Sequence, residues 1–145
     1  MLATRLMPCL LMSNGALVKT IRFKEGSYVG DPINAVRIFN QKEVDELILL
    51  DIHATTQNRG IDFETLEKIV SECFMPICYG GGVRTLEDMR RLYALGIEKV
   101  ALGAAAFEWI RAEEPLWIVH RILAEASILE AHGDAVAAAE ILASG

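Results

Sequence analysis

The sequence predicts an α/β fold made of four βα units, which form half of a TIM barrel, followed by a C-terminal helical hairpin. Two observations carry this prediction. Short apolar runs alternate with stretches whose apolar residues repeat at helical spacing, and the links between them are short. Strands joined in this way run parallel, with right-handed crossovers. A complete barrel takes about 250 residues, whereas this chain has 145, so we expect that it cannot close a barrel alone.

The composition indicates one compact domain, because 52% of the residues are hydrophobic. With 20 acidic and 14 basic side chains, the net charge of -6 offers no basic face to nucleic acid. No apolar stretch reaches the roughly 18 residues of a membrane span, and no signal peptide is recognised. The three cysteines form no CxxC pair and leave an odd number, so we expect reduced, mostly buried thiols. We also expect that the protein binds neither a metal nor a cofactor, and that it is cytoplasmic.

The first third of the chain is predicted to contain a strand, a hairpin arm and a helix. Residues 5–12 form a short apolar run that ends at a Ser-Asn-Gly turn signal, which favours a strand. Residues 16–23 alternate apolar and polar positions before a Glu-Gly turn, which indicates a hairpin arm. Asp31 supplies an N-cap directly before Pro32, so we expect a helix over residues 32–41.

Three further strands are predicted to alternate with two helices. One nearly continuous apolar run ends in an acid, as a strand buried on both faces of a parallel sheet would. Asp62 and Thr85 are N-caps of apolar-periodic stretches, and Gly96 is the stop signal of the second. The strands are expected at 46–52, 76–81 and 99–104, and the helices at 63–74 and 85–96.

The last part of the chain is predicted to be a helical hairpin. Apolar residues repeat at helical spacing from Trp117 to Leu129, a His-Gly pair stops this helix, and Asp134 caps a second, alanine-rich one. Its apolar surface exceeds what a free tail should expose, so we expect it to pack on the half-barrel or on a partner chain. We therefore divide the chain into a half-barrel at 1–108 and a helical extension at 109–145.

Several separated motifs occur in a recognisable order along the half-barrel, among them "MLATRLMPCL", "GALVKT", "DELILLDIHAT" and "PICYGGGVRTLEDMRRLYALGIEKV". On these motifs, residues 1 to about 108 resemble the N-terminal half of the cyclase subunit of imidazole glycerol phosphate synthase. They are most similar to the cyclase-like paralogues of surface-polysaccharide clusters, which work with an amidotransferase to install an acetamidino group on a sugar. The resemblance implies a barrel-type lyase related to histidine biosynthesis, a phosphorylated substrate, and a glutaminase partner that supplies ammonia.

The resemblance also implies a site at the carboxyl ends of the strands. Lys19 matches the flexible-loop lysine that closes over substrate, and Asp51 matches an acid that lines the site, so these two are the candidate catalytic residues. Gly80, Gly81 and Gly82 match the family's phosphate loop. In such a loop, missing Cβ atoms let backbone N-H groups approach an anion.

Other positions depart from the family pattern. Gly103 and Ala104 stand where the family usually offers an Asn-Thr pair to the same phosphate, so these candidate phosphate-binding residues have lost their polar side chains. Leu11 stands at the first catalytic aspartate and cannot act as an acid or base. The second catalytic aspartate and the second phosphate site belong to the family's C-terminal half.

Each of these residues also has a simpler interpretation. A glycine-rich loop after a strand can be only a tight βα turn, and Asp51 can cap a helix or pair with Lys19. Arg5, Glu46 and Lys99 match three of four charged residues around the family's ammonia entrance, or they are plain surface ion pairs. A histidine at position 53 could be a general base, but no sequence feature orients it.

Two classes of function follow. In the first, the chain lacks full catalytic machinery and serves as a phosphate-binding or protein-interaction module; the missing acids favour this class. In the second, it is an oligomeric lyase or amidotransferase-linked cyclase subunit acting with ammonia on a phosphorylated sugar or a nucleotide-derived substrate. The unpaired edges of an open four-stranded sheet favour a homodimer or higher even oligomer, in which copies pair their outer strands to close a ring.

Overall fold

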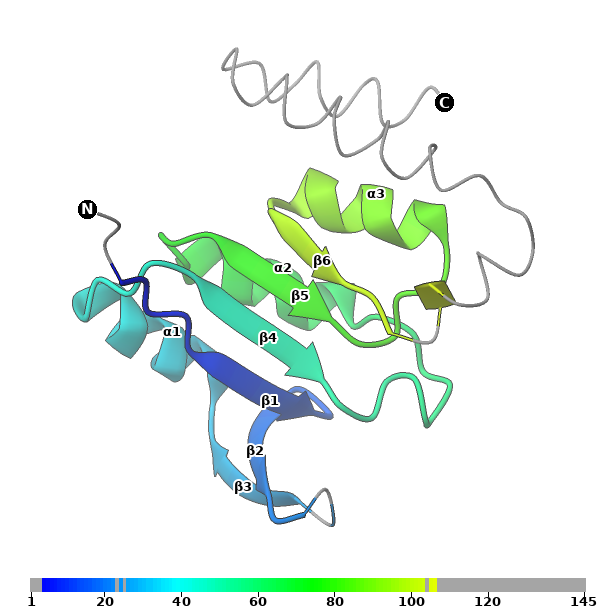
Figure 1. Cartoon of the computed structure of the whole chain (residues 1–145), viewed down its shortest axis with the longest axis horizontal. Coiled ribbons are helices and arrows are strands. Elements are labelled where there is room, and N and C mark those ends of the chain that lie inside the picture. Colours follow the sequence, from blue (N-terminus) through cyan, green and yellow to red (C-terminus); the bar gives the residue numbers. More distant parts are fainter. Residues whose placement is uncertain (1–3, 23, 25, 104, 107–145) are drawn as a thin grey trace.

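A computed structural model describes residues 4–22, 24, 26–103 and 105–106 of the chain. The predicted helical extension at 109–145 and Ala104 lie outside the described residues. The described part contains six strands and three helices (Figure 1). In chain order they are β1 (Cys9–Ser13), β2 (Ala16–Thr20), β3 (Gly26–Gly30), α1 (Pro32–Gln41), β4 (Leu47–Asp51), α2 (Phe63–Glu72), β5 (Ile77–Gly80), α3 (Leu86–Leu95) and β6 (Lys99–Ala101).

All six strands form one sheet in the order β3-β2-β1-β4-β5-β6. The pairs β1-β4, β4-β5 and β5-β6 are parallel, whereas β2 runs antiparallel to both β1 and β3. Figure 1 shows the β2-β3 hairpin projecting from the end of β1, beyond the four parallel strands. The predicted α/β class, the parallel strand order and the hairpin arm are therefore confirmed, and the arrangement is compatible with a partial barrel.

The helices begin where the sequence predicts, because the predicted caps form. Side-chain oxygens of Asp31 and Asp62 accept hydrogen bonds from backbone N-H groups three residues on, and Thr85 forms a capping box with Asp88. Gly96 ends α3 in the left-handed conformation, with φ of 103°. Each helix is ten residues long, and none within the described ranges combines the length and apolar composition needed to cross a membrane.

Some predicted boundaries are wrong by a few residues, for local reasons. The strand predicted from residue 5 begins at Cys9, because Pro8 has no N-H to donate and enters the ladder only through its carbonyl, which accepts from Ile48. Helix α2 ends at Glu72 rather than at residue 74. There the Asn40 side chain donates to the Glu72 carbonyl and accepts from the N-H of Phe74. The last strand also ends early, at Ala101.

The core lies between the helices and one face of the sheet. Leu47 and Leu49 of β4 are fully buried, whereas Ile48 and Leu50 between them are only half-buried. This alternation corrects the expectation of a strand buried on both faces, because the described helices pack against one face alone. The core residues include Met12, Leu47, Leu49, Val36, Leu66, Ile69, Ile77, Tyr79, Met89 and Leu92.

The opposite side of the sheet, which we call the free face, carries the other half of each strand. Strand pairing aligns one row, Cys9, Ile48, Cys78 and Lys99, across the four parallel strands. Cys9 is exposed there, and Cys78 is half-buried. The expectation of mostly buried thiols is therefore wrong for Cys9, since no described helix covers this face.

Candidate functional site

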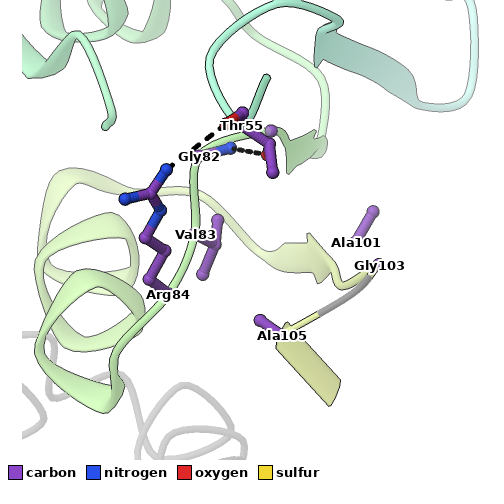
Figure 2. Close-up of a pocket in the computed structure, with 8 residues that line it drawn as sticks. Thr55, Gly82, Val83, Arg84, Ala101, Gly103 and Ala105 are labelled. Carbon is purple, nitrogen blue, oxygen red and sulfur yellow. Dashed lines mark hydrogen bonds between the residues drawn. The ribbon is translucent and has the colours of Figure 1, made fainter. Parts of the chain in front are cut away.

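A pocket of about 360 Å³ lies at the carboxyl ends of β5 and β6 (Figure 2). Thr55 reaches it from the loop after β4, residues 81–84 border it after β5, and Ala101, Gly103 and Ala105 border it around the end of β6. These eight residues include one cationic side chain, that of Arg84, and no carboxylate. In a chain with a net charge of -6, this local balance favours an anionic ligand.

The glycine loop after β5 is shaped by close backbone contacts. Gly81 and Gly82 have φ angles of 109° and 73°, which are strained for other residues. A Cβ on Gly81 would overlap the backbone carbonyl of Asp51, and a Cβ on Gly82 would lie 2.8 Å from the carbonyl oxygen of Gly60. Both glycines are therefore required by the turn itself, whatever the pocket binds.

The loop after β4 is tied to the glycine loop by hydrogen bonds. The N-H of Gly82 donates to the Thr55 hydroxyl at 3.1 Å, and the Arg84 guanidinium donates to the Thr55 carbonyl at 3.4 Å (Figure 2). The same guanidinium also donates to the Asn58 side chain. Because the Thr55 hydroxyl accepts from Gly82, its own hydrogen is left to donate. Sequence reasoning missed both Thr55 and Arg84, although a cation directly after a glycine-rich loop is a usable signal.

The predicted phosphate-binding residues divide into two groups. Gly81, Gly82 and Gly103 line the same pocket. Gly80 does not line it, and an added Cβ there would lie 2.9 Å from the side chains of Leu50 and Ala101 on the free face. Among the described residues, no atom lies within 4 Å of the position that a Cβ on Gly103 would take.

The two candidate catalytic residues lie apart from this pocket. Asp51 is buried and accepts hydrogen bonds from the N-H groups of His53 and Ala54, at 3.1 and 3.0 Å. Its ionic partner is Arg59, at 3.2 Å, rather than Lys19. Lys19 is exposed on the hairpin, opposite Ser27, and neither residue lines the pocket.

His53 has an orienting partner that the sequence did not reveal. Its Nδ1 lies 2.8 Å from the Ser13 hydroxyl, at the point where β1 ends next to the end of β4. Both side chains are half-buried. The pair therefore stands at the same edge of the sheet as the glycine loop.

A charged cluster occupies the opposite, amino end of the strands. The Lys99 ammonium donates to both oxygens of Glu46, at 2.8 and 2.6 Å, and Arg5 lies 3.5 Å from the same carboxylate. Glu46 is only 2% exposed. The three residues that the resemblance grouped around an ammonia entrance thus contact one another through a buried acid.

The described residues contain no group of three or more His, Cys, Asp or Glu side chains placed to hold a metal ion. Two of the three thiols, those of Cys73 and Cys78, also lack the features of nucleophiles. Burial raises the pKa of both Cys73 and Cys78, and the neighbouring Glu46 carboxylate raises that of Cys78 further. At neutral pH these two cysteines are therefore held as thiols rather than thiolates.

Comparison with known proteins covers most of the chain. The profile of the family described as "Histidine biosynthesis protein" matches residues 5–115. A Pseudomonas aeruginosa protein provisionally named imidazole glycerol phosphate synthase subunit hisF2 is 57% identical over 106 residues, 73% of this chain and 42% of that protein. A Vibrio vulnificus protein provisionally named subunit hisF3 is 56% identical over 108 residues, 74% of this chain and 42% of that protein. The chain thus spans about 42% of the length of these relatives.

Proposed function

The chain belongs to the histidine biosynthesis protein family, and on that premise we propose that it is a cyclase-like partial barrel that binds the phosphate group of a sugar phosphate in the glycine pocket. The chain shares this family with relatives named as synthase subunits. Because it spans less than half of their length, their activity as whole proteins does not pass to it directly. Its own residues have to support the role.

The observation that carries the proposal is the composition of the pocket wall. Arg84 supplies a positive charge, the Thr55 hydroxyl has a hydrogen to donate, and glycines bring the backbone within reach of a ligand. None of the described residues that line the pocket carries a negative charge. A phosphate group is small enough for this pocket and matches its donors.

A second feature is that the strands themselves offer no group for proton transfer. The row formed by Leu11, Leu50, Gly80 and Ala101 crosses the four parallel strands near their carboxyl ends. None of these side chains can transfer a proton. The carboxylate of Asp51 is already engaged by Arg59 and two backbone N-H groups. On these grounds we propose that Asp51 stabilises the loop after β4 rather than transferring a proton.

Calorimetric titration with inorganic phosphate and with ribose 5-phosphate tests the proposal. We expect binding by the natural chain and its loss in Gly103→Val, since Gly103 lines the pocket and no described atom lies within 4 Å of its Cβ position. Gly30→Val is the matched control, because its Cβ also has nothing within 4 Å and lies on β3, outside the pocket. A variant at Gly81 would not serve, because it would disrupt the turn. Equal binding by Gly103→Val and Gly30→Val would refute the assignment.

The proposal includes a glutaminase subunit as a partner at the amino ends of the strands. Apolar side chains are exposed in the segments that precede β1 and β5, with Leu6 64% and Phe74 87% exposed. The cluster of Arg5, Glu46 and Lys99 lies at the same end. An exposed apolar surface beside a charged centre is typical of a protein interface.

A further inference from the structure

The pair of Ser13 and His53 is not accounted for by phosphate binding. Ser13 is the last residue of β1, and His53 comes two residues after β4, the parallel neighbour of β1. The 2.8 Å contact between the Ser13 hydroxyl and Nδ1 therefore joins two segments 40 residues apart. It lies at the carboxyl edge of the sheet, where parallel α/β folds bind their ligands.

His53 is held by its backbone as well as by its ring. Its N-H donates to the Asp51 carboxylate at 3.1 Å, and its carbonyl accepts from the N-H of Gln57 at 2.9 Å and from the Thr56 hydroxyl at 3.2 Å. Among the described residues, only Ser13 forms a hydrogen bond with the ring. The imidazole is thus fixed in place, and no described side chain occupies its Nε2.

A hydroxyl partner suits an imidazole that both takes and gives a proton. When the Ser13 hydroxyl donates to Nδ1, Nε2 carries the ring proton, and when it accepts from Nδ1, Nε2 is a base. Because a hydroxyl can play both parts by rotating, it does not lock the ring into one tautomer. A backbone carbonyl, which only accepts, would do so.

The same loop connects this imidazole with the glycine pocket. Thr55, two residues after His53, lines the pocket and accepts from Gly82. His53 stands at the β1-β4 boundary and the pocket begins at β5. One to two strand spacings separate them, about 5–10 Å. A sugar phosphate has a comparable length.

We propose that His53, positioned by Ser13, is the acid–base residue of this site and acts on the sugar of a ligand whose phosphate lies in the glycine pocket. This inference rests on the proposed function. For a reducing sugar the step is ring opening. Nε2 removes the proton of the anomeric hydroxyl, the bond between C1 and the ring oxygen breaks, and its electron pair goes to that oxygen. The ring oxygen then takes the proton back from the imidazolium, so no further reactant is required.

Exchange between the two anomers of ribose 5-phosphate, followed by NMR, tests the step. We expect the full chain to accelerate exchange and His53→Gln to lower the accelerated rate about a hundredfold, at the lower end of the range of general acid–base catalysis. Ser13→Ala should lower it as well, and Ser13→Thr should restore most of it by restoring the hydroxyl. Nitrogen-15 spectra of the histidine side chains should show a changed tautomer ratio at His53 in Ser13→Ala and not in Ser13→Thr.

Phosphate titration of the same samples separates the two hypotheses. Suppose that the natural chain and His53→Gln bind inorganic phosphate equally. If both then accelerate anomer exchange to the same extent, or if neither accelerates it, the role of His53 is wrong and the phosphate site stands. If the natural chain does not bind phosphate, both fail. Loss of acceleration in His53→Gln with phosphate binding retained supports the inference.

Discussion

At the residue scale, a buried carboxylate stands at each end of β4 and is paired there. Glu46 precedes the strand and is held by Lys99 and Arg5, while Asp51 ends the strand and is held by Arg59. Both acids are at most 6% exposed. A carboxylate removed from water is costly unless it is paired and hydrogen-bonded, so these partners matter more than those of exposed acids.

The first prediction compares two lysines with similar ion-pair distances. Lys99→Met leaves the buried Glu46 carboxylate with only the longer contact to Arg5, and should lower the free energy of unfolding by about 2 kcal/mol. Lys68→Met removes an exposed pair with Glu64, 2.7 Å long, and should cause no measurable change. Urea unfolding of both variants measures the difference. An equal loss in the free energy of unfolding in both variants would show that the burial of Glu46 does not make its ion pair more stabilising than an exposed one.

At the scale of the elements, the helices are defined by caps that the sequence states directly. Asp62 begins α2 by accepting from both the hydroxyl and the N-H of Thr65, at 2.7 and 3.0 Å. The Thr65 hydroxyl bond, and after it the backbone bond, lower the pKa of Asp62 below its ordinary value of 3.8. The ionised cap is therefore favoured by the folded state.

The second prediction follows from the direction of this pKa shift. The pKa of Asp62 is lower in the folded chain than in the unfolded chain. The ionised cap therefore contributes its full stabilisation at pH values above the unfolded pKa, and this contribution is lost as the pH falls through the folded pKa. The Asp62→Asn variant should be as stable as the natural chain at pH 7, since Asn caps nearly as well as Asp. Below a pH of about 4, it should lose less stability than the natural chain does. Asp62→Ala should instead lose about 1 kcal/mol at pH 7. Thermal unfolding across pH distinguishes these outcomes, and an unchanged acid limb in Asp62→Asn would contradict the argument.

At the scale of the whole molecule, the free face and the outer strands call for a covering partner. The free face exposes Cys9 and half-exposes Leu11, Ile48 and Leu50. β6 is paired on one side only within the described sheet. Unpaired strand edges and an apolar face both favour association.

The third prediction is that the chain forms a homodimer or higher even oligomer through this free face. Light scattering should give an even multiple of the chain mass of 16.0 kDa. Leu11→Glu, which adds a charge to the free face, should lower the mass. Ile21→Glu, at a position 74% exposed on the hairpin, should leave it unchanged. In the oligomer Cys9 should react slowly with a thiol reagent, and faster in Leu11→Glu. A single-chain mass for the natural protein would overturn the expectation.

The extent to which sequence anticipated the site differs between neighbouring residues. The glycine loop was predicted, because φ angles of 109° and 73° and close backbone contacts leave a visible requirement for glycine. Thr55 was missed, because its link to Gly82 joins residues 27 apart and no local pattern marks it. Arg59 was missed as the partner of Asp51 for a similar reason, since a charged residue in a loop has many possible partners.

Most of the described elements and their order could be predicted from the sequence, since caps, turns and apolar periodicity are local and each is written in a few adjacent residues. The sequence also determined the family. The tertiary structure alone decided which face of the sheet is covered, that Asp51 pairs with Arg59, and that Ser13 meets His53 across two strands. The physical reason is that strand register brings together side chains distant in the chain, and register follows from packing of the whole sheet rather than from any local signal.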